Sequence, residues 1–278
     1  MIGLISLLKE IQGKLKAIIL AGSPGAGKGS VTRELDLSGF KTLNLDDTIA
    51  ALSKQNGFTL NQKATDAENR SKFMSAMYTA REKLGGDVKK KIKGDIPQTI
   101  ENKESFILDG TSASYNQTKT LYNQLIDNGY DVMMLFVYTD LETALDRNEK
   151  RFEKSGGEDR SLMPSAVYRT WLQVYKNFDE YKQLFRDNFV SVANTGKSET
   201  LKDVEKIFQK YIDPFKPIDA KPKTEKEQAK VEKLNKELNQ QMEEFLNSEE
   251  INNIINTSVS KEQAQQKITN FINKWKHY

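Results

Sequence analysis

The chain has 278 residues, of which 37% are hydrophobic and 29% charged, and 42 Lys and Arg stand against 39 Asp and Glu. Because it has no cysteine and one histidine, disulfides, cysteine-based metal centres and serine–histidine–aspartate catalysis are excluded. The net charge of +3 is too small to indicate a nucleic-acid partner. No apolar stretch reaches the roughly 18–20 residues that span a bilayer, so we expect no membrane segment and a cytoplasmic location.

The first segment, 1–14, is an apolar run that meets Lys9 and Glu10 at once, which predicts a short N-terminal helix rather than a signal peptide. From residue 15 to 212, short apolar runs alternate with longer stretches of helical period. Such dense apolar runs are typical of strands buried on both faces of a parallel sheet. This segment therefore predicts one domain with a three-layer α/β fold of about five parallel strands. The expected strands are 16–21, 41–45, 105–108, 131–138 and 188–193.

A glycine-rich segment follows the first expected strand: Gly22-Ser23-Pro24-Gly25-Ala26-Gly27-Lys28-Gly29-Ser30. Glycines let successive backbone N–H groups turn toward one phosphate, and a following helix adds partial positive charge. Lys28 supplies a mobile cation for the β- and γ-phosphates. We therefore expect a P-loop NTPase fold in which the whole segment binds ATP. Gly29 stands where most phosphate loops carry the hydroxyl that holds Mg²⁺, so Ser30 is the expected magnesium ligand.

Acidic residues follow the second and third expected strands. Asp46 and Asp47 come after the second, and Asp109 after the third. Ligands bind at the carboxyl ends of strands in such sheets, and a carboxylate there can orient an acceptor hydroxyl and take its proton. Asp109 could also bind Mg²⁺, directly or through water. The competing interpretation is that these residues cap helices, one of which would begin near Thr48.

Arginine is rare and clustered. Only eight of the 42 basic residues are arginines, and Arg147, Arg151, Arg160 and Arg169 fall together after the fourth expected strand. A guanidinium group binds phosphate oxygens bidentately, and phosphoryl transfer needs cations around the transferred group. Arg147, Arg151 and Arg160 are therefore candidate catalytic residues, and the polar segment 155–159 between them is a candidate lid. Salt bridges on a solvated face, with an ordinary surface loop, are the alternative.

The chain changes character at 213–223, where three of its six prolines gather and predict a linker. Residues 224–278 then predict a helical tail with two apolar stripes. Met242 and Phe245 end the first stripe, and Ala264, Ile268 and Phe271 lie in the second. Because the tail is neutral, docking on the domain or on a second copy fits it better than binding to a membrane or nucleic acid.

Together these motifs resemble the zeta-toxin branch of P-loop kinases, and the phosphate loop also resembles that of adenylate-type nucleotide kinases. The segment 106–111 is similar to the zeta motif that ends in (E/D)-G-T, and 160–164 to its R-x-x-P after a short lid. The resemblance implies ATP and Mg²⁺ as cofactors, and Asp109 and Thr111 at the acceptor. For the base after the second strand, Asp47 matches the family position best, with Asp46 as the alternative. Where both families carry an arginine after this motif, the chain has 112–114, Ser-Ala-Ser.

The sequence thus predicts an ATP-dependent phosphotransferase that acts on a hydroxyl or phosphate of a small molecule. A UDP-sugar, a nucleoside or nucleotide, and a polynucleotide 5′-hydroxyl remain open as acceptors. The expected catalytic residues are Lys28, Asp47, Asp46, Arg151, Arg160 and Arg147. The alternative is a P-loop NTPase or nucleotide-binding interaction protein that holds a partner with its C-terminal helices. A scaffold component that keeps a degenerate kinase fold is a third interpretation.

Overall fold

The structure is a computed structural model that describes residues 15–33, 37, 39–62, 66–87, 89–157, 159–194, 210, 224–246 and 248–273. The expected N-terminal helix (1–14) and the expected linker (213–223) lie outside the described residues.

Five parallel strands form one sheet in the order β2-β3-β1-β4-β5, which confirms the predicted three-layer α/β fold. The strands are β1 (Lys16–Ala21), β2 (Lys41–Asn44), β3 (Phe106–Asp109), β4 (Asp131–Tyr138) and β5 (Phe189–Ala193). Strands β1 and β4 have the predicted bounds, and the other three differ by one residue at one or both ends. Every residue of β1 is buried, as a central strand covered on both faces requires.

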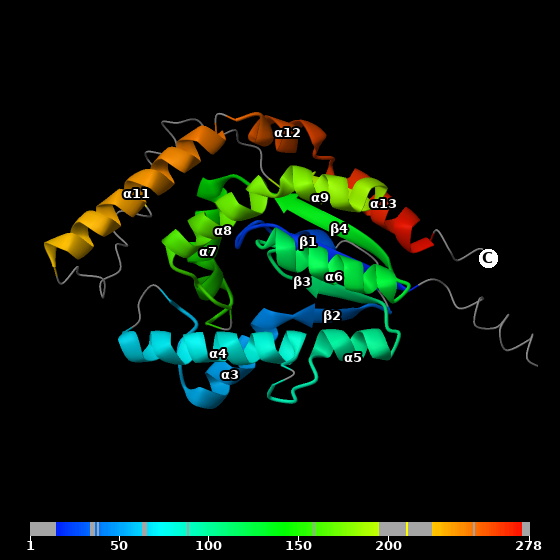
Figure 1. Cartoon of the computed structure of the whole chain (residues 1–278), viewed down its shortest axis with the longest axis horizontal. Helices are drawn as coiled ribbons and strands as arrows, with labels where there is room; N and C mark the ends of the chain where they lie inside the picture. Colours follow the sequence, from blue (N-terminus) through cyan, green and yellow to red (C-terminus); the bar gives the residue numbers. More distant parts are fainter. Residues whose placement is uncertain are drawn as a thin grey trace, which may run out of the picture.

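Helices connect the strands and cover both faces of the sheet (Figure 1). They are α2 (Lys28–Thr32), α3 (Leu45–Asn56), α4 (Ala67–Gly85), α5 (Asp95–Glu101), α6 (Tyr115–Asp127), α7 (Leu141–Lys154), α8 (Pro164–Lys176), α9 (Phe178–Phe185), the 3₁₀ helix η1 (Arg186–Asn188), α11 (Glu225–Leu246), α12 (Glu249–Thr257) and α13 (Lys261–Asn273). Asp66, Ser114 and Asp140 cap three of them, because each side chain accepts a hydrogen bond from the backbone N–H three residues on. None of the helices in the described part of the chain has the length and apolar character needed to cross a bilayer.

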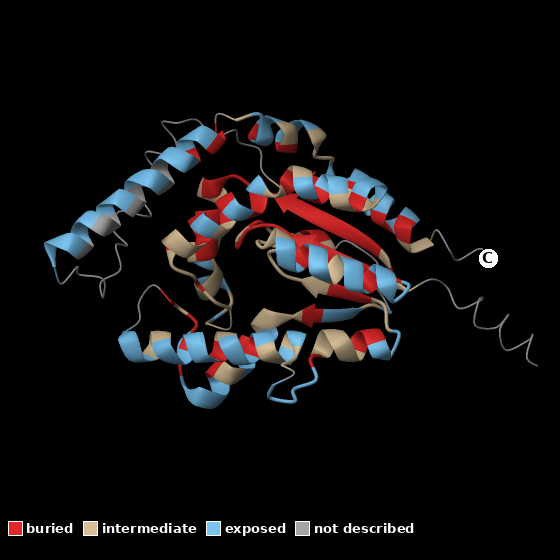
Figure 2. Cartoon of the chain, viewed as in Figure 1, coloured by how far each residue is buried: buried red, intermediate tan, exposed pale blue. Residues whose placement is uncertain are grey.

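Alternate strand side chains pack into two separate clusters, one on each face of the sheet. On one face, Ile19 and Phe136 pack among residues of α5 to α9, α11 and α12. On the other, Ile18 and Leu20 pack with Val31 of α2 and with α13. Figure 2 shows burial concentrated in the strands and on the helix sides that face them. The alternation follows from the two-residue period of a strand and holds the sheet rigid between two layers.

A separate helical subdomain lies beyond β2, where Figure 1 shows α3, α4 and α5 along one edge of the sheet. Helices α3 and α4 share a small core of their own. Its buried members are Ile49, Phe58, Leu60, Phe73, Ala76 and Ala80. This subdomain stands next to the carboxyl end of β2 and so borders the region where a ligand is expected.

The tail helices pack on the opposite side of the sheet, at the β5 edge. Phe245 and Ile251 are buried in the cluster of the first face, whereas Ile268 and Phe271 are buried in that of the second. Between them Val259 donates its N–H to the carbonyl oxygen of Ser191 in β5 (2.8 Å). The tail therefore covers both faces and the edge itself.

Candidate active site

The phosphate loop lies at the carboxyl end of β1, the central strand. From there the chain continues to β2 and β3 on one side, and β4 and β5 complete the sheet on the other. Open α/β sheets bind ligands at such a switch point, because the connections leave toward opposite faces and open a crevice. The loop, 22–30, therefore occupies the position that its sequence predicted.

Backbone groups from neighbouring elements fix the shape of this loop. Gly25 has φ +82°, and a Cβ there would lie 2.2 Å from the carbonyl oxygen of Ala144 in α7. Only glycine fits this position. Ser23 and Ala26 are fully buried. On the other side, the Gly22 N–H donates to the carbonyl oxygen of Thr111 (3.2 Å), so Thr111 contacts the loop through its backbone.

Lys28 folds over the mouth of the loop. Its Nζ donates to the carbonyl oxygens of Gly22 (2.9 Å) and Ser23 (3.2 Å). Burial lowers the pKa of Lys28 from 10.5 to about 8, against the attraction of Asp109 and Asp46, which raises it. The ammonium group is thus held where phosphate oxygens would meet it, within electrostatic reach of both carboxylates.

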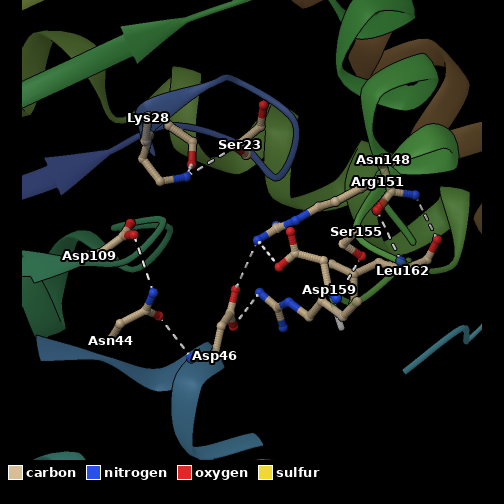
Figure 3. Close-up of polar contacts among 12 residues, drawn as sticks. Ser23, Lys28, Asn44, Asp46, Asp109, Asn148, Arg151, Ser155, Asp159 and Leu162 are labelled. Carbon is tan, nitrogen blue, oxygen red and sulfur yellow. Dashed lines mark hydrogen bonds and ion pairs between the residues drawn. The ribbon is translucent and has the colours of Figure 1, made fainter. Parts of the chain in front are cut away.

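Asp46 faces this loop together with two arginines. Its carboxylate lies 3.0 Å from Arg160 and 4.0 Å from Arg151, and Arg151 also pairs with Asp159 at 3.0 Å. Figure 3 shows Lys28 and Asp46 directed toward one space, with Arg151 beside it. The structure therefore brings together the lysine, one aspartate and two of the three candidate catalytic arginines.

Asn44 explains why Asp46 rather than its neighbour turns inward. Asn44 is the N-cap of α3, and its Oδ1 accepts the Asp46 N–H (2.8 Å). The helix therefore begins at Leu45, and the interpretation of Asp46 or Asp47 as its cap is wrong. Asp47 follows about 100° further round the helix and is exposed.

Asp109 lies beside the loop on β3. Asn44 Nδ2 donates to its Oδ2 (3.4 Å), and the capping interpretation fails here too because Ser114 caps α6. Burial raises the pKa of Asp109, while Lys28 acts in the opposite direction. A carboxylate that has lost its water in this way is stabilised by a cation, so its surroundings suit a metal ligand.

The donor set near the loop fits Mg²⁺ only if phosphates complete it. In the described part of the chain, no group of three or more acidic or histidine side chains could hold a metal. Mg²⁺ commonly takes one or two protein oxygens and fills its remaining positions with water and phosphate oxygens. The Ser30 hydroxyl and the Asp109 carboxylate could supply oxygens of this kind.

Arg147 takes a different place from the other arginines. Its guanidinium donates to the carbonyl oxygens of Gly25, Ala26 and Asn194, each at 3.3 Å. Asn194 Nδ2 also donates to Ala26 O (2.8 Å). Arg147 therefore supports the outer side of the phosphate loop and ties it to the end of β5, away from Asp46.

Asn148, a residue that the sequence motifs did not single out, holds the segment that follows Arg160. This buried side chain on α7 donates to Leu162 O and accepts from Leu162 N–H, both at 2.9 Å. The segment that carries Arg160 is thus anchored at Leu162. The role of 155–159 as a lid stays a prediction. A signal was present, because Asn148 interrupts the apolar stripe of Leu141 and Leu145 and a buried amide needs partners.

The fold and the loop define a class. A parallel sheet whose central strand leads through a glycine-rich loop and a lysine into a helix is the architecture of a P-loop kinase. A carboxylate and two arginines directed at that loop are side chains of the kind that phosphoryl transfer uses.

The family model described as Zeta toxin matches residues 75–206, which is just under half of the chain. The match includes Asp109, Arg147, Arg151 and Arg160 and begins after the phosphate loop and Asp46. Over residues 75–206 the chain is therefore similar to the Zeta toxin family, which confirms the resemblance that its motifs predicted. No curated protein matches it.

Several solved structures are similar to the chain at low identity. The chain is 15% identical to a protein of the PezAT chromosomal toxin–antitoxin system of Streptococcus pneumoniae, covering 87% of this chain and 95% of that one with a TM-score of 0.41. It is also 15% identical to a chain of the Pnkp1/Rnl/Hen1 RNA repair complex, with a TM-score of 0.39. That match covers 61% of this chain and 47% of the other, so this chain spans about half of that one. The chain is 14% identical to a chain in a complex of AvrRxo1-ORF1 and -ORF2 with ATP. That match covers 67% of this chain and 56% of the other, with a TM-score of 0.43.

Proposed function

We propose that the chain is a kinase that transfers the γ-phosphate of ATP to a hydroxyl group of a small-molecule acceptor. The observation that carries this proposal is the pairing of Asp46 with Arg160 (3.0 Å) within electrostatic reach of Lys28. A nucleotide-binding switch needs the loop and its lysine, whereas phosphoryl transfer also needs a carboxylate and cations at the far side of the γ-phosphate.

Each residue of the site then has a distinct role in the proposed reaction. Lys28 and the amides of the loop bind the β- and γ-phosphates, and Arg151 and Arg160 neutralise charge on the transferred group. Asp46 orients the acceptor hydroxyl and accepts its proton. Because Asp46 now holds Arg160, nucleotide binding exchanges one carboxylate for phosphate oxygens at that arginine. Ser30 and Asp109, together with phosphate oxygens, would hold Mg²⁺, which would supply further charge neutralisation.

A hydroxyl acceptor suits this site better than a phosphate acceptor. The segment 112–114, where related kinases carry an arginine, is committed to internal contacts. Ser112 Oγ donates to Leu20 O (2.8 Å), and Ala113 O accepts from Asn177 Nδ2 (3.0 Å). UDP-sugars and nucleosides are therefore the first acceptors to try.

The interaction-protein alternative has less support in the tail. Met242, Phe245, Ile254 and Ile268 of the tail helices are buried against the domain's own core. Apolar residues used in this way are not available to a partner. Apart from Ala229, the exposed positions of α11 that the structure describes are polar.

The decisive experiment compares two adjacent aspartates. The full chain is incubated with γ-labelled ATP and separate pools of UDP-sugars, nucleosides, nucleotides and 5′-hydroxyl oligonucleotides. Asp46→Asn should lower labelled product by about a hundredfold to ten-thousandfold, because the general base is lost. Asp47→Asn is the matched control and should stay within a few-fold of the parent. Calorimetry should show similar ATP affinity for both variants.

Three results would contradict the proposal. Acceptor-independent ADP release by the parent favours the NTPase alternative. Retained transfer in Lys28→Ala favours the scaffold interpretation. Loss of transfer in Asp47→Asn with retention in Asp46→Asn reverses the assignment of the base.

A further inference from the structure

The hydroxyl of Tyr175, on α8, lies directly beneath the phosphate loop. It accepts the backbone N–H of Thr139 (3.0 Å) and lies 3.5 Å from Oγ of Ser23 and from Val137 O. Ser23, Thr139 and Tyr175 are all fully buried. This side chain therefore links the loop to the turn between β4 and α7 at a point that water does not reach.

Trp171, one helical turn earlier on α8, completes the support of that turn. Its Nε1–H donates to the carbonyl oxygen of Thr139 (2.8 Å). Its ring packs edge-on against Tyr175, with centroids 4.8 Å apart and planes at 90°. Both backbone groups of Thr139 are thus held by α8, and the rotamer of Tyr175 is fixed by its neighbour.

The tail reaches the same place from the other side. Phe245 of α11 packs edge-on against Trp171, with centroids 5.7 Å apart and planes at 84°. Phe245 is 3% exposed, so the contact is fully enclosed. Buried side chains in contact run without a break from α11 through Trp171 and Tyr175 to Ser23 of the loop.

We infer that Tyr175 is a positioning residue for the phosphate loop, and that docking of α11 through Phe245 and Trp171 sets its position. The inference rests on the proposed function, since its effect is on nucleotide binding. Loop amides bind phosphate well only when they are held in the binding geometry before the ligand arrives. A close-packed core passes a displacement on rather than absorbing it, so loss of Phe245 is felt at the loop.

The test removes one oxygen. Tyr175→Phe keeps the ring and leaves the Thr139 N–H without this partner. The Kd for Mg–ATP, measured by calorimetry on the full chain, should rise about fivefold, the effect of one buried hydrogen bond. Tyr130→Phe is the matched control, because its buried hydroxyl also bonds backbone carbonyls, at Glu104 (2.9 Å) and Thr99 (3.3 Å), beside the amino end of β3. It should lower the melting temperature comparably and leave the Kd unchanged.

A second pair of variants tests the tail. Phe245→Ala and Phe271→Ala each truncate a buried phenylalanine of the tail, but Phe271 lies in the cluster on the other face of the sheet. Phe245→Ala should raise the Kd about threefold and Phe271→Ala should not, while Phe245→Leu restores most of the affinity. Combined with Tyr175→Phe, Phe245→Ala should add less than its separate effect, because both act on one contact chain.

The outcomes separate the two proposals. If the parent binds no Mg–ATP, the proposed function and this inference fall together. If the parent binds and Tyr175→Phe binds as tightly as Tyr130→Phe, the inference alone is overturned. Equal Kd values for Phe245→Ala and Phe271→Ala would remove the part assigned to the tail.

Discussion

The two sides of the candidate active site are held by different kinds of contact. The side proposed to bind phosphate is built from backbone: Ser23 and Ala26 are fully buried, and α7, β4 and α8 close around them. The proposed acceptor side is built from charged side chains of α3, α7 and the segment after it. There Asp46 and Arg151 remain 26% and 37% exposed.

The two kinds of contact differ in how readily they rearrange when a ligand binds. Close-packed backbone gives one fixed geometry, suited to the triphosphate that every reaction of this class shares. Ion pairs at a partly exposed site can exchange partners at low free-energy cost, because water replaces part of each interaction. The acceptor side can therefore rearrange when substrate enters, and the phosphate side cannot.

The greatest loss of activity is expected for a variant of Arg160 on the acceptor side. Arg160→Met should lower kcat about a thousandfold, the low end for loss of a transition-state arginine, with a small change in ATP affinity. Steady-state kinetics with the identified acceptor measure it. Arg169→Met, on the exposed surface of α8, is the control and should retain the parental rate. Equal rates for the two variants would refute the role given to Arg160.

The next effect strikes the phosphate side. Gly25→Ala adds a Cβ at positive φ against Ala144 O, so the free energy of unfolding should fall by about 3 kcal/mol and ATP binding should be lost. Chemical denaturation measures the first and calorimetry the second. Gly29→Ala, whose Cβ would meet nothing within 4 Å, should hold or slightly raise the stability. If Gly25→Ala were as stable as the parent, the carbonyl oxygen of Ala144 would not restrict the loop at this position.

A smaller effect tests how the acceptor side is aimed. Asn148→Ala removes both hydrogen bonds to Leu162, which should cost about 2 kcal/mol of stability. It should also lower kcat more than it raises the Kd for ATP, since Arg160 lies just before the anchored Leu162. Asn188→Ala removes bonds to Asp131 and Val132 at the amino end of β4 and should affect stability alone. Parallel loss of kcat in both variants would count against a positioning role.

The smallest effect is a pH dependence of the phosphate side. Because the pKa of Lys28 is lowered to about 8, ATP affinity should fall above pH 8, by up to about tenfold per pH unit, and binding near pH 8 should take up a proton. The stability of the ligand-free protein changes with pH in the opposite direction to its ATP affinity. Between pH 8 and 10.5 the unfolded chain holds more protons at Lys28, so this residue's contribution to stability rises with pH.

Calorimetry in buffers of different ionisation enthalpy measures the proton uptake. Lys28→Met should abolish it and flatten the affinity profile between pH 7.5 and 9. An unchanged proton uptake in that variant would assign the titration to another group.

The sequence predicted the fold well where local signals are strong. Strands β1 and β4 are apolar runs with clear limits, and the glycine-rich phosphate loop follows β1 directly. The site was harder, because a choice between adjacent residues depends on where a helix starts. Asn44 places the start of α3 at Leu45, and that register turns Asp46 inward and Asp47 outward.

Other features depend on contacts that no local pattern reveals. The arginine cluster was visible, but the separation of Arg147 from Arg151 and Arg160 follows from the packing of α7 against the loop. The stripes of the tail predicted helices that dock. They did not predict that Phe245 and Phe271 would lie on opposite faces of one sheet.

The bridge between Val259 and Val192 has a consequence for solubility. A terminal strand with unpaired N–H and C=O groups invites another molecule to extend the sheet, and β5 would be such a strand if the tail did not occupy it. At the opposite border β2 is four residues long and carries the exposed Lys41, which discourages the same association. A chain shortened before α12 would therefore expose β5 and gain a route to aggregation that the intact protein blocks.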